Sequence, residues 1–164
     1  MYGRYETKFS ISPHPATEFK IRECGQNEWS RFSRYHYLNK NIAPAECYGL
    51  YNQNNDIIGF CAIRYFPHPK VNNIVKCHRI VVLPDYQGIG LGTMFLSAVA
   101  EIYRNKNKKL YITTTLKNFA RSLAKSKKFV CSRCSIAKPS KSCLATIAKN
   151  VRKVKTATLI YVGR

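Results

Sequence analysis

A glycine-rich turn between a predicted strand and a predicted helix is the part of the sequence best suited to chemistry. The apolar run 81–83 ends at Pro84, glycines follow at positions 88, 90 and 92, and an apolar helical pattern then begins. Backbone N–H groups in the first turn of a helix have no intrahelical partner, and the helix dipole favours negative charge there. Glycines also let the backbone approach a ligand closely. This order of elements therefore predicts a binding site for a pyrophosphate.

The spacing of the glycines excludes two other phosphate-binding turns. Residues 87–92 lack the G-x-G-x-x-G order of dinucleotide-binding turns, and no Gly-Lys-Ser/Thr follows as in a Walker loop. The turn instead resembles the acyl-CoA signature Gln/Arg-x-x-Gly-x-Gly/Ala of the GNAT superfamily of N-acetyltransferases. In that family an apolar-x-Val-x-Pro strand end precedes the signature, and residues 80–84 reproduce it. A tight strand-to-helix turn without a ligand is the alternative.

The resemblance implies an acyltransferase that takes acetyl-CoA as its acyl donor. By position, backbone groups of Ile80 and Val82 would pair with the pantetheine, and one N–H of this strand would polarise the thioester carbonyl. Gln87 opens the loop. The backbone N–H groups expected to bind the pyrophosphate are those of Gly88, Ile89, Gly90, Leu91, Gly92 and Thr93.

The resemblance also indicates candidate groups for proton transfer when an amine attacks the thioester. Family members often carry a Glu or His on the strand before the loop, and His78 lies there, four residues before Val82. On a regular strand His78, Ile80 and Val82 would share a face, and an imidazole titrates near neutrality. A half-exposed polar strand residue is the alternative for His78. His36 and Tyr37, in the segment that usually walls the acceptor site, are further candidates, unless they pack in an aromatic helix face.

The sequence departs from the family at the general acid. Many relatives carry a tyrosine on the helix after the fifth strand, followed by Gly-Phe. Residues 118–129 have leucine and alanine where that tyrosine belongs, and Lys128 takes the place of the glycine. Either Tyr37, Tyr111 or water protonates the leaving thiolate, or the chemistry differs from simple acetylation.

The charge of the chain is the second strong signal. The chain carries 28 Lys and Arg residues against 8 Asp and Glu, a formal net charge of +20. Residues 101–164 hold 17 of the basic side chains and a single carboxylate, Glu101. A bound CoA needs only a few of these charges, so the excess predicts contact with a polyanion such as RNA, DNA or a ribosomal surface. A generally basic surface without a partner is the alternative.

Three hypotheses of function follow from these signals. The first is an N-acyltransferase that moves an acetyl group from acetyl-CoA to an amine on, or carried by, nucleic acid. The second is an enzyme resembling phage proteins that modify DNA adenine on a GNAT-like scaffold. The third is a nucleic-acid-binding module that keeps the CoA loop without turnover. A cationic small-molecule acceptor, such as a polyamine or aminoglycoside, is disfavoured because the basic surface would repel it.

Length and composition are those of one globular domain. No apolar run approaches the roughly 20 residues of a membrane span, and the first residues lack a signal-peptide core, so we expect a cytoplasmic protein without membrane contact. Seven cysteines, an odd number, favour free thiols. No histidine follows the C-x-x-C pair Cys131 and Cys134, so we expect packing there rather than a metal site.

The elements that must position these residues follow the order of a GNAT fold. We expect an α/β (α+β) class, with a mixed, mostly antiparallel sheet flanked by helices on both faces, in a single acyltransferase domain over residues 1–164. An irregular arm would span residues 1–18, and a basic insertion, residues 135–155, would precede the last strand. Asn27 would cap the first helix. Expected strands cover residues 19–22, 45–51, 57–66, 75–83, 110–115, 129–132 and 157–162; expected helices cover 28–38, 88–106 and 116–126, with a basic helix within 139–155.

Overall fold

The computed structural model describes residues 6–10, 18–36, 41–68, 70–71, 73–136 and 155–163. The strands in this part are β1 (Glu6–Ser10), β2 (Glu18–Glu23), β3 (Glu46–Tyr51), β4 (Ile57–Tyr65), β5 (Ile74–Val82), β6 (Lys109–Thr114), β7 (Phe129–Ile136) and β8 (Lys155–Tyr161). The α-helices are α1 (Trp29–Phe32), α2 (Leu91–Asn105) and α3 (Lys117–Lys125). The 3-10 turns are η1 (Gln26–Glu28), η2 (Ser33–Tyr35) and η3 (Pro84–Tyr86).

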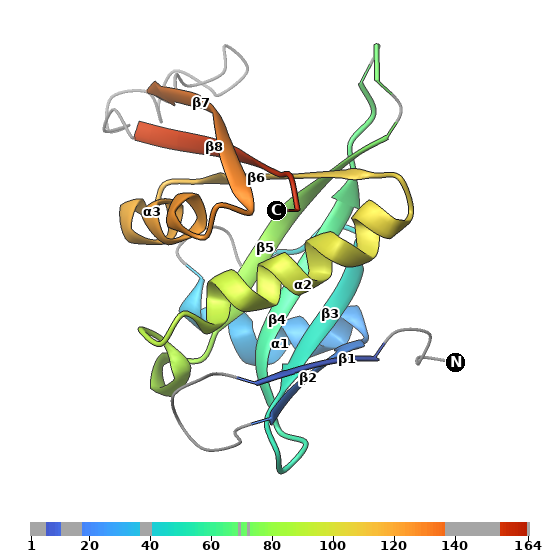
Figure 1. Cartoon of the computed structure of the whole chain (residues 1–164). Helices are drawn as coiled ribbons and strands as arrows, with labels where there is room; N and C mark the ends of the chain where they lie inside the picture. Colours follow the sequence, from blue (N-terminus) through green and yellow to red (C-terminus); the bar gives the residue numbers. More distant parts are fainter. Residues whose placement is uncertain are drawn as a thin grey trace, which may run out of the picture.

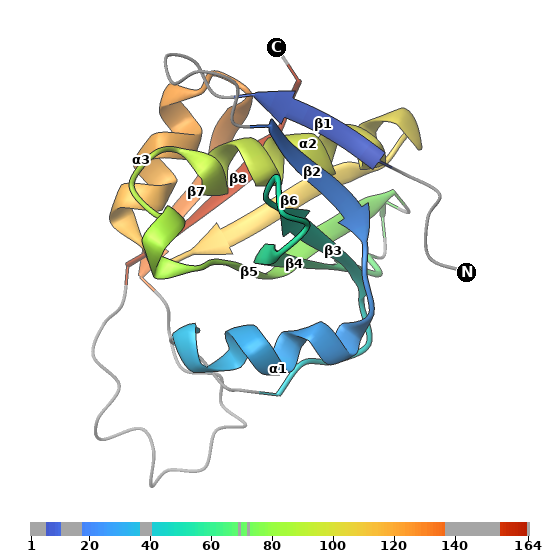
Figure 2. The same ribbon diagram turned by 90° about the horizontal axis from the view of Figure 1, so that it is seen from below.

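The strands form one sheet in the order β1-β2-β3-β4-β5-β6-β8-β7. Among the described strands only the pair β5–β6 is parallel, and the other neighbours are antiparallel. Helices α2 and α3 cover one face of the sheet, and α1 lies against the other (Figure 1, Figure 2). The expected mixed, mostly antiparallel sheet with helices on both faces is therefore confirmed.

Two apolar clusters hold the layers together. On one face, α2 presents Phe95, Leu96 and Val99, none of which is exposed, to the larger core between helix and sheet. These positions recur at helical spacing, as the sequence predicts for this segment. On the opposite face, Trp29 and Phe32 of α1 pack against Phe60 of β4, with ring centroids 5.4 and 5.9 Å apart. The sheet that carries the glycine turn is thus buried on both sides.

The expectation for the N-terminus was wrong over five residues. Residues 6–10, expected within an irregular arm, form strand β1, which pairs with β2 at the edge of the sheet. An edge strand of five residues with one partner is too short to show a clear alternation of apolar and polar residues, so the sequence does not reveal it. The basic insertion expected over residues 135–155 is shorter than predicted, because β7 runs to Ile136 and β8 begins at Lys155. A basic helix was expected within residues 139–155, of which residues 139–154 lie outside the described part.

The first helix is also shorter than the expected range 28–38. It divides into η1, the four-residue α1 and η2, and the backbone is extended by His36. The hydroxyl of Ser30 donates to the carbonyl of Asn27, and that of Ser33 donates to the carbonyl of Ser30. Such side-chain bonds to nearby backbone compete with regular helix. Asn27 lies inside η1 and does not cap a helix, contrary to the prediction.

Within the described residues, no helix has the length and apolar character that crossing a membrane requires.

Candidate active site

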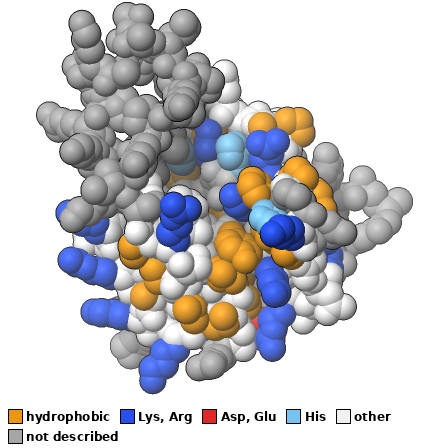
Figure 3. All heavy atoms as spheres, turned by 90° about the horizontal axis from the view of Figure 1, so that it is seen from above, with side chains coloured by type: hydrophobic (Ala, Val, Ile, Leu, Met, Phe, Trp, Pro, Cys, Tyr) orange, Lys and Arg blue, Asp and Glu red, His pale blue; other side chains and the backbone are white. Residues whose placement is uncertain are grey.

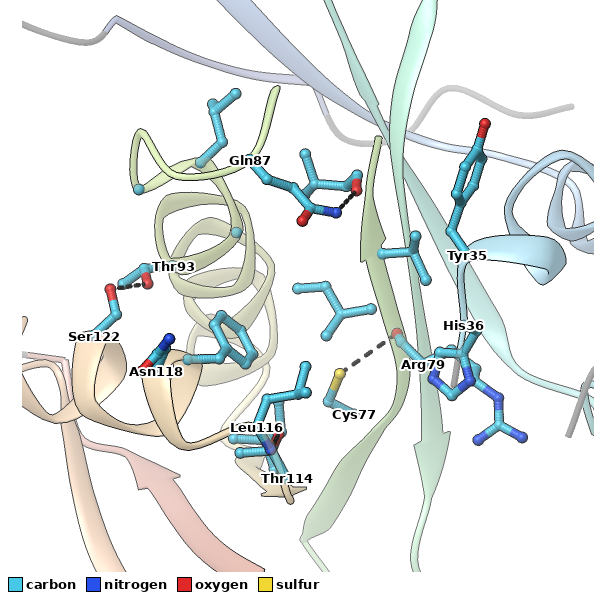
Figure 4. A pocket seen from close by; sticks show the side chains of 18 of the residues that line it. Tyr35, His36, Cys77, Arg79, Gln87, Thr93, Thr114, Leu116, Asn118 and Ser122 are labelled. Atoms are coloured by element: carbon cyan, nitrogen blue, oxygen red, sulfur yellow. Dashed lines mark hydrogen bonds between the residues drawn. The ribbon is translucent and has the colours of Figure 1, made fainter. Parts of the chain in front are cut away.

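The parallel strands β5 and β6 in the middle of the sheet separate, and a cavity lies between them beyond that point. Pairing of β5 with β6 runs from Ile74↔Lys109 to Cys77↔Ile112, although β5 continues to Val82. A cavity of about 580 Å³ opens beyond the last pair. Its walls are β5, the end of β6, the glycine turn, the start of α3 and the residues that follow α1 (Figure 4). The cavity therefore connects the two faces of the sheet.

The backbone of β5 presents hydrogen-bonding groups to this cavity. Groups on successive strand residues point to opposite edges. The N–H of Leu83 donates to the carbonyl of Ile58 on the β4 side, so those of Val82 and Ile80 face the cavity. The carbonyl of Val82 accepts a 2.7 Å hydrogen bond from the Gln87 side chain. This bond ties the glycine turn to the strand and gives Gln87 a structural role.

The glycine turn has the geometry that close approach of an anion requires. Gly88 and Gly90 have φ angles of 84° and 86°, in the left-handed region, and Gly90 is the N-cap of α2. A Cβ on either glycine would meet no atom within 4 Å, so this side of the turn is open. Of the nine predicted CoA-binding residues, Ile80, Val82, Gln87, Gly88, Gly90, Leu91, Gly92 and Thr93 line the cavity. Ile89 is not among the described lining residues and is 57% exposed.

Helix α3 completes the wall opposite β5, and its contribution was not predicted. The hydroxyls of Thr93 and Ser122 lie 2.8 Å apart, which joins the first turn of α2 to α3. A Cβ at Gly92 would lie 3.4 Å from the Phe119 ring, at van der Waals contact, so the start of α2 lies close to α3 here. Asn118 also lines the cavity (Figure 4). The sequence signalled these residues only by their place after β6.

A β-bulge at His78 overturns the expectation that His78, Ile80 and Val82 share a face. Ala62 pairs with Arg79 and Ile63 with Cys77, so His78 is an extra residue in β5. Ile80 and Val82 belong to the core on the α2 side. The charges that act on His78 are those of Arg79 and Arg64, and His78 in turn acts on His36, on the α1 side.

Arg79, which the sequence reasoning missed, is held firmly at the α1 end of the cavity. It is only 8% exposed. Its Nη1 donates to the carbonyl of His78 at 2.9 Å, and its Nη2 donates to the carbonyl of Asn41 at 3.2 Å. Tyr35 and His36 lie beside it, across β5 from Thr93 and Ser122 (Figure 4). An arginine in a strand normally suggests an exposed position, so only the tertiary structure reveals this one.

Both histidines of the cavity are neutral at pH 7. Burial, with the charges of Arg79 and His78, lowers the pKa of His36 to about 4. Burial, with the charges of Arg79 and Arg64, also lowers the pKa of His78. Nη1 of Arg79 lies 3.5 Å from Nδ1 of His78. A guanidinium can only donate, so this contact assigns the proton of neutral His78 to Nε2. That nitrogen is buried and has no hydrogen-bond partner among the described residues.

We expect the free energy of unfolding to fall as the pH is lowered from about 6.5 to about 4. In that range the unfolded chain protonates His36, whereas the folded chain keeps it neutral, so protons favour the unfolded state. Urea unfolding at pH 7.5 and 4.5 measures the loss. His36→Phe keeps an aromatic ring beside Trp29, 5.5 Å away in the wild type, and should lose less stability on acidification. An equal loss of unfolding free energy in wild type and variant would show that His36 is not the source of the pH dependence.

The two tyrosines considered as proton donors are not placed in the cavity. Tyr37 lies outside the described residues, and Tyr111 is not among the described residues that line the cavity.

The cysteines of β7 differ from the expectation. Cys131 and Cys134 are exposed, not packed as expected, and their sulfur atoms lie 3.2 Å apart. In the described part, no group of three or more His, Cys, Asp or Glu side chains could hold a metal ion.

Comparison with known proteins assigns the family. The sequence model described as Acetyltransferase (GNAT) family matches residues 15–125, from before β2 to the end of α3. The chain belongs to this GNAT family. Membership makes it an N-acetyltransferase that uses an acyl-CoA donor, and the open strands and glycine turn agree with that chemistry.

Solved GNAT structures share the fold over most of their length. The ribosomal-protein-S18-alanine N-acetyltransferase of Escherichia coli has a TM-score of 0.62 at 14% identity, covering 87% of this chain and 92% of that chain. The spermidine/spermine N-acetyltransferase of Vibrio cholerae has a TM-score of 0.64 at 10% identity, with 87% and 91% covered. A GNAT acetyltransferase of Streptococcus pneumoniae has a TM-score of 0.59 at 14% identity, with 87% and 98% covered. A comparison with curated protein sequences finds no match.

Proposed function

We propose that this GNAT protein transfers an acetyl group from acetyl-CoA to a weakly basic amine on nucleic acid, RNA or DNA. The observation that carries the proposal is the composition of the acceptor end of the cavity. Arg79, His36 and His78 lie there, and no Asp or Glu is among the described residues that line the cavity. The site therefore suits an amine that is already neutral at pH 7, such as the exocyclic amine of a nucleobase.

The same observation argues against a polycationic acceptor. An ammonium group must lose its proton before it can attack, and a buried guanidinium beside it raises the cost of bringing it in. The V. cholerae neighbour is named for spermidine and spermine, which are polycations. This chain shares its fold, but the described lining offers no carboxylate to attract such an acceptor. A second neighbour is named for an alanine of ribosomal protein S18, so acceptors in this fold are not confined to polycations.

Acetyl-CoA would bind along the glycine turn and the open edge of β5. The pyrophosphate would lie against the N-terminus of α2, where Gly88 and Gly90 leave the turn open. The pantetheine would follow the backbone groups of Ile80 and Val82, which face the cavity. The thioester would then lie where β5 and β6 separate, between the donor and acceptor ends.

Between the two histidines, we assign the role of proton acceptor to His36. His78 was the first candidate from sequence, but the contact with Arg79 leaves Nε2–H of His78 as a donor. His36 is neutral at pH 7 and lies at the acceptor end. A base with a pKa of about 4 is weak, and it suffices only for an amine that needs no prior deprotonation. As the amine attacks, its proton passes to His36, and the leaving thiolate of CoA is protonated by solvent.

The basic second half of the chain would hold the nucleic acid. Arg121 and Lys125 lie one turn apart on α3 and at helical spacing from the cavity residues Asn118 and Ser122. On the face seen in Figure 3, Lys and Arg side chains are frequent and Asp and Glu are nearly absent among the described atoms. Both substrates occur in the cytoplasm, where we place the reaction.

Transfer of label from acetyl-CoA tests the proposal. Purified protein is incubated with acetyl-CoA that is labelled in its acetyl group. Parallel reactions contain total RNA, genomic DNA, spermidine or ribosomal proteins as the acceptor. We expect nuclease-releasable label on RNA or DNA, and none with a Gly90→Glu variant as the control. Nucleoside mass spectrometry then identifies the modified base. Label on spermidine or protein but not on nucleic acid would overturn the proposal, and so would salt-sensitive nucleic-acid binding without any transfer.

A further inference from the structure

We propose that Arg79 and the Nε2–H group of His78 form an oxyanion subsite at the α1 end of the cavity, which binds a phosphate or carboxylate group of the acceptor. The inference rests on the proposed function in that it places the acceptor at this end. It goes beyond that function by naming the group that is recognised and the residues that recognise it.

The guanidinium of Arg79 is preorganised. Its two bonds run to carbonyls of residues far apart in sequence, His78 on β5 and Asn41 in the segment before β3. Because the side chain is only 8% exposed, little water screens its charge. A fixed, desolvated guanidinium is the group proteins most often use to bind planar or tetrahedral oxyanions.

The bulge supplies the second donor. It inserts His78 as an unpaired residue next to Arg79, and bulges near active sites re-aim side chains. Arg79 approaches Nδ1 of His78, which leaves the ring proton on Nε2. Nε2 is buried and has no hydrogen-bond partner among the described residues. A buried N–H without an acceptor is unfavourable, and an oxyanion in the cavity would supply the acceptor.

The surrounding charges have the same sign. Arg64 on β4 is close enough to lower the pKa of His78, and Arg34 lies over the ring of Tyr35 at 4.7 Å. Among the described lining residues there is no carboxylate to neutralise this end of the cavity. The complementary ligand is therefore an anion, whereas an ammonium group would be repelled.

Paired probes that differ only in the anionic group test the subsite. The protein is first saturated with CoA, which blocks the donor end. Calorimetry then compares adenosine 5′-monophosphate with adenosine, and phenylalanine with phenylalaninamide. We expect the anionic member of at least one pair to bind at least about tenfold more tightly than the neutral or amide member, as for a charge-assisted contact.

Three variants separate direct contact from general electrostatics. Arg79→Met removes the charge and should abolish the preference for the anion. Arg79→Lys keeps the charge but loses the planar pair of N–H donors, so it should reduce the preference without abolishing it. Arg64→Met removes one charge from an exposed neighbouring position and should leave most of the preference. CoA binding serves as the check of folding. If Arg79→Met does not fold, His78→Phe, which removes the Nε2–H donor, should weaken the preference instead.

The outcomes distinguish this inference from the proposed function. A preference for phosphate that depends on Arg79 supports both. A preference for carboxylate alone supports the subsite but argues against a nucleic-acid acceptor. Equal binding of both members in both pairs, or a preference that survives Arg79→Met, overturns the subsite, whatever the labelling assay shows.

Discussion

Replacement of Gly90 by glutamate is expected to abolish the binding of acetyl-CoA. Gly90 is the N-cap of α2 with a φ of 86°, and a Cβ there would point into open space on the cavity side of the turn. The new carboxylate would occupy the position where the N–H groups of α2 meet the pyrophosphate, and it would repel the phosphates. We expect the affinity measured by calorimetry to fall at least about a hundredfold, which corresponds to about 2.7 kcal/mol.

Two neighbouring substitutions serve as matched controls. Gly90→Ala places a Cβ at the positive φ of residue 90 without adding a charge, and should cost about 1–2 kcal/mol of stability. Ile89→Glu introduces the same charge one residue away, on a side chain that is 57% exposed and absent from the described cavity lining. We expect Ile89→Glu to retain most of the wild-type affinity. If it weakens binding as much as Gly90→Glu, the loss reflects general repulsion, and the glycine turn is not the pyrophosphate site.

The geometry of the glycine turn was predictable from sequence because its determinants are local. Pro84 ends the strand, Gly88 and Gly90 adopt positive φ, and the helix begins at Leu91, all within eight residues. Turn chemistry of this kind depends on residue type more than on distant contacts. The helix that follows was predicted three residues too long at its N-terminus, since the glycines belong to the turn.

The geometry of the α1 end of the cavity depends on long-range structure, so the sequence did not predict it. The bulge at His78 arises from the register between β4 and β5, and no residue type in β5 announces it. The burial of Arg79 depends on the carbonyl of Asn41, 38 residues away. The bulge overturns the expectation that His78, Ile80 and Val82 share a face, and Arg79 is a buried cation that no sequence signal marks.

Reversal of three basic charges on and after α3 is expected to weaken nucleic-acid binding strongly. Arg121, Lys125 and Lys128 are exposed, and the first two lie at helical spacing from the cavity residues. Each phosphate contact to a single strand contributes about 0.7 to the slope of log affinity against log salt. The triple change to glutamate should therefore lower the slope by about 2, and reduce affinity for a 20-nucleotide RNA at least about tenfold at 0.1 M salt. Fluorescence anisotropy across a salt series measures both.

A second triple variant decides whether position or total charge matters. Lys106 is the C-cap of α2, and Lys108 and Lys109 follow it, with Lys109 the first residue of β6. That end of α2 lies away from α3 (Figure 1), and changing the three lysines to glutamate alters the net charge equally. If the basic surface acts only through its total charge, both triples will lose the same affinity. A larger loss from the α3 triple places the polyanion beside the cavity, where an acceptor base could enter. If the α3 triple variant instead weakens CoA binding and leaves RNA binding unchanged, these side chains bind the 3′-phosphate of CoA, and the nucleic acid binds elsewhere.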